Sequence, residues 1–378
     1  MIRLYNKKDI PSIVSLEEET LGTSLGYEML LDNLSNRFSH FYVYEENKDI
    51  LGYISISFDG SQGEILNFCV KKDYQHKGIG TKLLAYAINM LHSKGAMSFI
   101  LEVRESNINA INLYLKFGFK KISIRKNYYS NSENALVLLK EMVSYLDLED
   151  AYITSFCKKI VHEDYIEYTC PEVSGKYFYN YYECPNDDKI MEKLYHREGF
   201  VQFDLLHPYT GKLKFSDYES EIELHSSIYG IRILRNTSYK VKRIEESDRE
   251  WFINYLYNDS KEYGEKYAKD NALKHASVAL DLKKTNWYFV FDDKKPVGFI
   301  CSFIYKDACK LEDFVILDEY QHKGYGSALF SYVLNELKEK GIHDIYLTAD
   351  LEDTPKVMYE RMGFTLVGKR YQVREVFE

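Results

Sequence analysis

The chain has 378 residues, of which 45% are hydrophobic and 28% are charged, and its formal net charge is −9. This composition is that of a globular protein with two or three domains. The negative charge is not offset by any clustered basic stretch. It therefore argues against binding to nucleic-acid phosphates and suits a cationic acceptor such as an amine.

The six cysteines form no CxxC pair, so we expect reduced thiols and no bound metal. The first ten residues, MIRLYNKKDI, lack the apolar core of a signal peptide. No apolar run approaches the roughly 20 residues that a membrane-spanning helix needs. These features predict a cytoplasmic protein without a membrane partner.

The first part of the chain predicts strands that alternate with helices. In order, we expect a hairpin, a strand, a helix capped by Gly95, a second strand, a shorter helix that ends at Gly118, and two closing strands. The longer helix is indicated by apolar residues at i, i+1, i+4, i+5 and i+8. The earlier strands are predicted at Phe41–Glu45, Ile50–Phe58, Ile65–Val70 and Ser98–Val103.

Residues 146–238 predict a third, smaller α/β segment, for which half of a similar fold is one interpretation. A helical pattern covers Asp187–Glu198, and strand-like runs cover Val201–Leu206 and Ile222–Ile233.

The last part of the chain repeats the first. The heptad YQHKGIG (Tyr74–Gly80) returns as YQHKGYG (Tyr320–Gly326), 246 positions later, and the alignment slips by one residue where Tyr114 meets Tyr359. A hairpin, two strands, helices before Gly341 and Gly363, and two closing strands are predicted again. The expected strands are Trp287–Phe291, Val297–Tyr305, Leu311–Ile316 and Asp344–Ala349.

Such self-similarity indicates a duplicated domain, here at residues 1–145 and 239–378. The period is too long for a solenoid. The predicted fold class is α/β, with a mixed sheet and helices on its faces.

The heptad joins a strand to a helix through two glycines. Gly78 and Gly80 let the backbone approach a ligand closely, and the N-terminus of a helix attracts an anion. The third glycine and the ribose-binding acid of a Rossmann motif are missing, and so is the Gly-Lys-Ser/Thr of a Walker loop.

A strand, Tyr-Gln-x-x-Gly-x-Gly, a helix, a strand and then "N…A…LY…GF" together resemble the GNAT family of acetyl-CoA-dependent N-acetyltransferases. The resemblance covers both copies and implies that each loop holds the pyrophosphate of CoA while the preceding strand bonds to the pantetheine arm. The implied cofactor-binding residues of the first copy are Phe68, Cys69, Val70, Gln75, His76, Lys77, Gly78, Ile79, Gly80 and Thr81. Those of the second copy are Phe314, Val315, Ile316, Gln321, His322, Lys323, Gly324, Tyr325, Gly326 and Ser327.

The first copy also contains LEVRESNINAINLYLKFGF (Leu101–Phe119), which resembles the bacterial ribosomal-protein-alanine N-acetyltransferases. That resemblance implies that Glu102 is the general base, Tyr114 the general acid and Asn107 a cofactor contact. The chemistry agrees, because an α-amine with a pKa of about 8 must lose a proton before it attacks a thioester. Backbone N–H groups near Cys69 and Val70 are candidates to hold the oxyanion.

Several of these residues have plainer explanations. A solvated strand face would explain Glu102, and packing would explain Tyr114 in a chain with 35 tyrosines. We expect Cys69 to pack rather than act as a nucleophile, Arg104 to form an ion pair, and the histidines of the two loops to contribute through their main chain. Tyr128 and Tyr129 either line the acceptor groove or pack the closing strands.

Both copies depart from the family patterns. The first has neither the proline nor the tryptophan that usually precedes the second helix, which puts its ribosomal target in question. In the second, Thr348 replaces the glutamate, so Tyr359 remains as the expected acid and Asp350 or Glu352 as alternative bases.

Three functions follow. The leading one is acetyl transfer to a protein N-terminus, such as that of a ribosomal protein, by the first copy. The alternatives are acetylation of a small amine by the second copy and a non-catalytic acyl-CoA sensor or scaffold.

Overall fold

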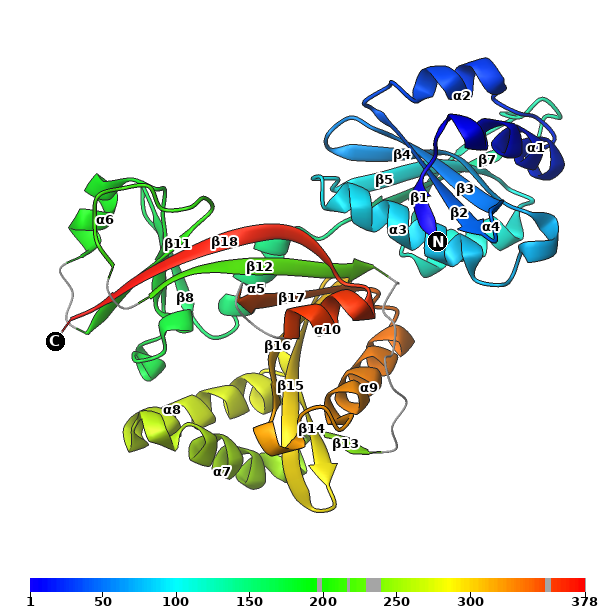
Figure 1. Cartoon of the computed structure of the whole chain (residues 1–378). Coiled ribbons are helices and arrows are strands. Elements are labelled where there is room, and N and C mark those ends of the chain that lie inside the picture. Colours follow the sequence, from blue (N-terminus) through cyan, green and yellow to red (C-terminus); the bar gives the residue numbers. More distant parts are fainter. Residues whose placement is uncertain (196–198, 216–217, 229–238, 351–354, 378) are drawn as a thin grey trace. The chain divides into compact units, whose positions relative to one another are not determined.

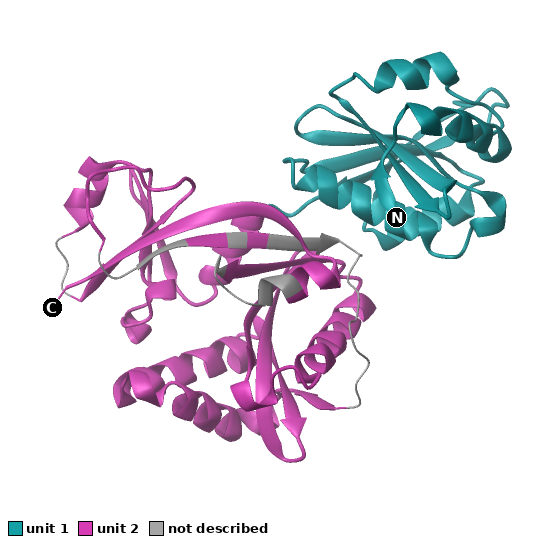
Figure 2. Ribbon diagram, viewed as in Figure 1, with its two compact units in different colours: residues 1–144, 227–231 teal, residues 145–226, 232–378 magenta. Residues whose placement is uncertain are grey.

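The computed structural model describes residues 1–195, 199–215, 218–228, 239–350 and 355–377, in two compact units (Figures 1 and 2). Unit 1 comprises Met1–Ser144 and Ser227–Ile231, and unit 2 comprises Tyr145–Ser226 and Arg232–Glu378. Among the described residues, no helix is both long enough and apolar enough to cross a membrane.

Unit 1 is built on a seven-stranded sheet of order β1-β2-β3-β4-β5-β7-β6. Its strands are β1 (Ile2–Leu4), β2 (Ser39–Glu46), β3 (Asp49–Phe58), β4 (Gln62–Val70), β5 (Ser98–Arg104), β6 (Lys120–Arg125) and β7 (Ala135–Glu141). Its helices are α1 (Ile10–Leu21), α2 (Tyr27–Asn33), α3 (Ile79–His92) and α4 (Ile108–Lys116).

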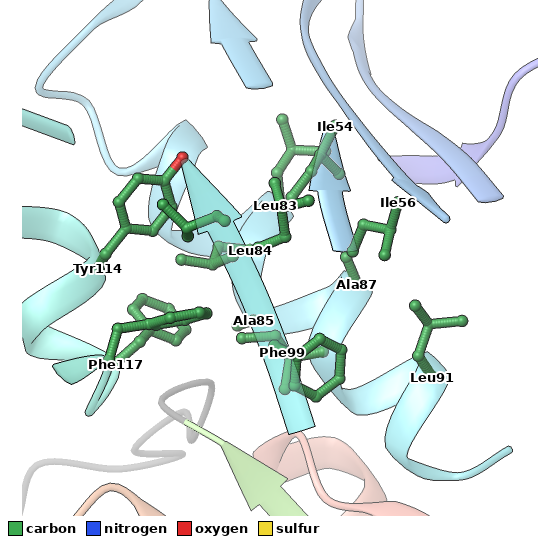
Figure 3. Packing of buried hydrophobic residues seen from close by; sticks show 14 of the residues in the cluster. Ile54, Ile56, Leu83, Leu84, Ala85, Ala87, Leu91, Phe99, Tyr114 and Phe117 are labelled. Carbon is green, nitrogen blue, oxygen red and sulfur yellow. The ribbon is translucent and has the colours of Figure 1, made fainter. Parts of the chain in front are cut away.

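Helices cover both faces of this sheet, so its central strands are apolar on both sides. Phe41 and Val43 pack with α1 and α2, whereas the intervening Tyr42 packs with α3. On β3, Tyr53 and Ile54 divide between the two faces in the same way. The alternation follows from the two-residue period of a strand. Figure 3 shows the core beneath α3 and α4.

The middle of the sheet opens because β4 and β5 part. Their parallel pairing runs from Gln62–Ser98 to Ile65–Leu101, and a register shift between β3 and β4 follows at Ser55/Ile56. The corresponding strands of unit 2 are paired from Ala308–Asp344 to Leu311–Leu347, again with a register shift beside them. The two parallel strands therefore part at equivalent residues in both copies.

Unit 2 is built on an eleven-stranded sheet of order β13-β14-β15-β16-β17-β12-β18-β11-β10-β9-β8. Its strands are β8 (Lys158–Val161), β9 (Ile166–Thr169), β10 (Tyr181–Glu183), β11 (Phe200–Leu205), β12 (Tyr218–Ile228), β13 (Lys240–Arg243), β14 (Thr285–Asp292), β15 (Lys295–Tyr305), β16 (Ala308–Ile316), β17 (Asp344–Asp350) and β18 (Thr365–Val376). Its α-helices are α5 (Tyr145–Ile153), α6 (Asp188–Leu194), α7 (Arg249–Asp259), α8 (Glu265–Ala276), α9 (Tyr325–Glu339) and α10 (Pro355–Met362).

The closing strands of the second copy differ from the expectation. Two strands were predicted after the shorter helix, but within the described residues only β18 follows α10. The place that β7 takes in unit 1, between β5 and β6, is taken in unit 2 by β12, between β17 and β18. This strand precedes the second copy in sequence, so local pattern could not assign it there.

The intervening segment has the strand pattern of a partial copy. Strands β8, β9 and β10 are antiparallel neighbours, β10 is parallel to β11 across α6, and β11 is antiparallel to β18. Strands β2, β3, β4, β5 and β7 of unit 1 follow the same sequence of directions around α3. Strands β12 and β18 are thus shared by both halves of unit 2.

The mixed α/β fold class is confirmed, and each strand predicted with bounds in the two copies coincides with an observed one within a few residues. In the intervening segment, α6 and β11 lie within or beside the predicted helix and strand. Residues 196–198 and 229–233 of those predictions lie outside the described residues.

Two equivalent glycines, Gly52 and Gly298, allow close contact with the strand that leads to each heptad. A Cβ on Gly52 would lie 2.9 Å from the carbonyl oxygen of Cys69, and one on Gly298 would lie 2.5 Å from that of Val315. Main-chain atoms cannot move aside as the end of a flexible side chain can, so overpacking is expected at both positions.

We predict that Gly298→Ala lowers the unfolding free energy of unit 2 by about 1–3 kcal/mol. Urea unfolding followed by tryptophan fluorescence isolates this effect, because the two tryptophans, Trp251 and Trp287, both lie in unit 2. Gly175→Ala is the control, since its Cβ would make an ordinary contact 3.4 Å from Tyr267. Equal midpoints for the two variants would contradict the prediction.

Candidate active site

The first heptad forms a loop whose backbone is shaped by left-handed residues. A 3-10 turn (Lys72–Tyr74) leads into Gln75. The side-chain amide of Gln75 donates a hydrogen bond to the Val70 carbonyl oxygen at 3.0 Å. His76 and Gly78 have φ values of 61° and 80°, and α3 then begins at Ile79. A Cβ on Gly78 would meet nothing within 4 Å, so the space beside this helix N-terminus is open. A pyrophosphate fits this environment.

The second heptad has the same geometry. The Gln321 amide donates to the Ile316 carbonyl oxygen at 3.2 Å, and His322 and Gly324 have φ values of 58° and 100°. One addition distinguishes this loop: the hydroxyl of Tyr239 donates to the Lys323 carbonyl oxygen at 3.0 Å while its ring stacks on Tyr325 at 3.9 Å.

The predicted pantetheine strand of the first copy lies where β4 has left β5. Phe68, Cys69 and Val70 still pair with β3, but they lie beyond the last residue that pairs with β5. The thiol of Cys69 is buried, which raises its pKa to about 12. A neutral, inaccessible thiol is a packing group, as expected.

Glu102 follows directly after Leu101, the last residue of β5 that pairs with β4. Its carboxylate accepts a short ion-paired hydrogen bond from Arg125 and a hydrogen bond from the hydroxyl of Tyr128. Hydrogen bonding to Glu102 is the main cause that raises the pKa of Tyr128. The Glu102 side chain is 25% exposed, so an acceptor can reach it from solvent.

Tyr114 projects from α4 with its hydroxyl directed away from Phe117 (Figure 3). Its ring lies 6.3 Å from that of Phe68 and 5.6 Å from that of Phe119. Burial raises the pKa of Tyr114 above its usual range, and the neighbouring Cys69 and Tyr129 add to the shift.

Tyr129 is electrostatically coupled to both Glu102 and Tyr114. Both predicted catalytic side chains therefore lie within electrostatic range of Tyr129.

Two further sequence predictions can be compared with the structure. Arg104 forms the expected ion pair, at 3.0 Å from Glu133, and its guanidinium lies over the Tyr129 ring. The Asn107 side chain caps α4 by accepting a hydrogen bond from the Ala110 N–H at 3.2 Å.

Sequence reasoning missed Glu17, a buried carboxylate on α1. It accepts hydrogen bonds from the hydroxyl of Ser24 at 2.7 Å, the N–H of Leu25 at 3.0 Å and the Asn67 amide at 2.5 Å, and also from the hydroxyl of Tyr53. It thereby ties the α1–α2 loop to β4 where the strands part. Its position was a signal, because Glu17 lies on the same helical stripe as Ile10 and Ile13.

In the second copy, Thr348 lies on β17 where Glu102 lies on β5. Tyr359 is buried like Tyr114, with its ring 6.0 Å from that of Phe364, the equivalent of Phe119. Of the two alternative bases, Glu352 lies outside the described residues, and so does the side chain of Asp350.

The family model described as the acetyltransferase (GNAT) family matches residues 9–119 and 244–364, more than half of the chain. The chain belongs to the GNAT family. The protein is therefore an N-acetyltransferase with two GNAT folds, and the GNAT fold uses acetyl-CoA.

Named relatives span about a third of the chain. An uncharacterized N-acetyltransferase of Methanocaldococcus jannaschii is 32% identical over 142 residues, which are 37% of this chain and 91% of the relative. A candidate ribosomal protein bS18-alanine N-acetyltransferase of Bacillus subtilis is 37% identical over 139 residues, which are 36% of this chain and 92% of the relative.

A crystal structure of the ribosomal-protein-S18-alanine N-acetyltransferase from Escherichia coli has 25% identity and a TM-score of 0.36, covering 38% of this chain and 94% of its own. As the sequence predicted, the N-terminal copy is the one that resembles these ribosomal-protein-alanine enzymes.

The equivalent lysines of the two heptads give a test of cofactor binding at each loop. We expect the chain to bind two equivalents of acetyl-CoA and each reversal, Lys77→Glu or Lys323→Glu, to weaken one of them roughly tenfold by repelling phosphate. Calorimetric titration with acetyl-CoA measures both affinities, and Lys48→Glu, at the exposed β2–β3 turn, is the control. If the unchanged chain bound one acetyl-CoA and either reversal weakened that binding, the prediction of one independent binding site at each heptad would be contradicted.

Proposed function

We propose that unit 1 transfers the acetyl group of acetyl-CoA to the N-terminal α-amine of a protein, with an alanine-starting ribosomal protein as the acceptor type. The observation that carries the proposal is the position of Glu102, one residue beyond the point where β4 and β5 part. The likeness to ribosomal-protein-alanine N-acetyltransferases supports the acceptor type.

Glu102 is suited to the role of general base. Arg125 and Tyr128 hold its carboxylate in place. An α-amine is largely protonated at neutral pH, so the carboxylate removes a proton, directly or through water, before the nitrogen attacks. Acetyl-CoA supplies the activated acyl group, as a thioester.

Tyr114 is suited to the role of general acid. Its raised pKa keeps the hydroxyl protonated throughout the neutral range, so a proton is available to the departing thiolate. The main chain at Cys69 and Val70, where β4 has left β5, is our candidate for binding the oxyanion. Asn107 and the first heptad complete the proposed cofactor site.

We predict that Glu102→Gln lowers kcat with an Ala-starting ribosomal-type peptide by about 10²–10⁴-fold, because the base is lost while the shape is kept. Release of CoA and the mass of the peptide product are the measurements. Glu141→Gln, an exposed carboxylate at the far end of the adjacent β7, is the matched control and should keep full turnover. Retained peptide turnover in Glu102→Gln would sink the assignment.

Tyr114→Phe should lower kcat for the same peptide by at least about 10²-fold, with little change in the KM for acetyl-CoA. Because burial raises the pKa of Tyr114, the parent enzyme should show no alkaline loss of kcat from this group below about pH 10. Tyr86→Phe, a partly buried tyrosine of the same core, is the control. A Tyr114→Phe enzyme with normal kcat would leave the leaving group without the proposed acid.

A further inference from the structure

Unit 2 contains a polar cavity of about 280 Å³ at the place where β16 and β17 part. Glu312 and Asp313 line it from β16, and Thr348 and Ala349 line it from β17. The rest of the wall comes from α5 and from the strands of the intervening segment, together with β18. The cavity therefore lies at the site that corresponds to Glu102 in unit 1, but a different part of the chain closes it.

The carboxylate at this site has changed strands between the two copies. In unit 1, Leu66 and Glu102 directly follow the last residues of β4 and β5 that pair with each other. In unit 2 the equivalent positions hold Glu312 on β16 and Thr348 on β17. Leu66 is 49% exposed, whereas Glu312 is largely buried and lines the cavity. Each opening thus has a carboxylate, which lies on β5 in unit 1 and on β16, the equivalent of β4, in unit 2.

Glu312 belongs to a buried network of ion pairs in which one lysine is shared by two glutamates. Lys310 is 1% exposed and bonds to both Glu312 and Glu149, the latter at 2.5 Å. Burial opposes ionisation of Glu149, but Lys310, Arg370 and the Tyr145 hydroxyl outweigh it and lower the pKa of Glu149. Burial raises the pKa of Glu312 to about 7, with Lys310 opposing this shift while Glu149 and Asp313 add to it.

Two residues that line the cavity, Gln202 and Gln372, each have a side-chain amide oxygen without a hydrogen-bond partner among the described residues. The side-chain nitrogens of Gln202 and Gln372 each donate to Asp204 at 3.2 Å, which fixes the direction of both amides. Gln202 is 1% exposed and Gln372 is 8% exposed, and within the described residues neither Oε1 atom has a hydrogen-bond partner. Buried polar atoms are rarely left unpaired, and an amide oxygen requires a donor.

A purely structural network would account for the ion pairs but not for the space or the unpaired oxygens. Arg370 bonds to Asp204 at 2.5 Å and thereby joins β18 to β11, much as Lys310 joins β16 to α5. Such pairs contribute little net stability, because their burial costs desolvation energy. They do set the charge of the cavity, where four carboxylates, Glu149, Asp204, Glu312 and Asp313, meet three basic groups.

We infer that this cavity is a second acceptor site, which binds a small primary amine bearing hydroxyl groups and uses Glu312 as the general base. The acidic excess suits an ammonium group, and the two amide oxygens and the hydroxyls of Tyr145, Tyr152, Tyr179 and Tyr181 suit hydroxyl and N–H donors. The volume is at the lower limit of the roughly 300–1,000 Å³ of drug-sized sites. A small molecule therefore fits better than a protein segment.

The reaction balances with acetyl-CoA as the co-substrate. The ammonium group gives one proton to the Glu312 carboxylate, and the free nitrogen lone pair forms a bond to the thioester carbonyl carbon. The C–S bond breaks as the amide forms, the nitrogen loses a second proton, and the CoA thiolate takes up one proton, for which Tyr359 is the nearest equivalent of Tyr114. The products are the acetamide, CoA thiol and one proton released to solvent.

The test uses the full chain carrying Glu102→Gln, so that any turnover by unit 1 is removed, and glucosamine as the probe. We expect glucosamine to bind in a calorimetric titration and to yield its N-acetyl product with CoA release. Adding Glu312→Gln should lower kcat by about 10²–10⁴-fold while changing the glucosamine affinity less than about threefold. Glu339→Gln, an exposed carboxylate at the end of α9, should leave both quantities unchanged.

Tryptophan fluorescence would reveal whether Glu312→Gln disturbs folding. If it does, a second variant and a second sugar test the inference. Gln372→Leu should raise the KM for glucosamine roughly tenfold and leave kcat nearly unchanged. Glucose, which lacks the amine, should bind at least about tenfold more weakly than glucosamine.

The pH profile provides an independent readout. In the chain that carries Glu102→Gln alone, kcat should fall as the pH drops below about 7, with both glucosamine and ethanolamine as substrates. The fall should be the same for the two amines, because it reports protonation of Glu312 and not of the amine. Glu312 faces Lys310 and Asp313 on its own strand, Glu149, Tyr145 and Tyr152 on α5, and Lys176 before β10.

No binding of glucosamine or ethanolamine, or full turnover in Glu312→Gln, would overturn the inference. So would an Ala-starting peptide whose turnover depends on Glu312. Because the probe, the variant and the unit all differ from those that test Glu102, either proposal can fail without the other.

Discussion

The parting of two parallel strands is the constraint on which both proposed acceptor sites depend. A continuous ladder between β4 and β5 would occupy the main chain that a cofactor needs, and it would close the route by which an acceptor amine approaches. The register shift beside each opening turns the strand away from its neighbour, and a glycine on the preceding strand permits the resulting close contact. The same few residues therefore determine where the heptad, the oxyanion site and the base can lie.

Around this common opening the two units differ in what closes it. In unit 1 the carboxylate of Glu102 is held by Arg125 and Tyr128 from the β6–β7 side and is partly open to solvent, as suits the end of a protein chain. In unit 2 the corresponding space is lined by Arg370 and Gln372 of β18, Ile222 of β12 and both polar and apolar side chains of α5. The intervening segment thus lines the proposed acceptor site of unit 2, and the residues around the two carboxylates distinguish the units, since the side chains of Glu102 and Glu312 are 25% and 22% exposed.

Much of this was readable from the sequence, because the heptads, the apolar runs and the helical stripes are local signals that recur in two copies. The exchange of β12 into the second sheet was not, since strand pairing across more than a hundred residues leaves no local pattern. Glu17 and Glu312 were missed for another reason. Glu17 is a charged residue on an otherwise apolar helical stripe, and Glu312 stands where the first copy has a leucine. Comparing the copies where they differ, and not only where they match, would have singled out Glu312.

The shared strands also bear on how the protein is made. All seven strands of the unit 1 sheet lie within the first 144 residues, so that sheet can form while the rest is still being synthesised. In unit 2, β12 leaves the ribosome well before β17 and β18, its neighbours on both sides. At about 5–20 residues per second, the delay before β18 is complete is roughly 7 to 30 s. Until β17 emerges, both edges of the eleven-residue β12 lack their final partners, and one edge still lacks its partner until β18 follows, which makes the nascent chain a natural client for a chaperone.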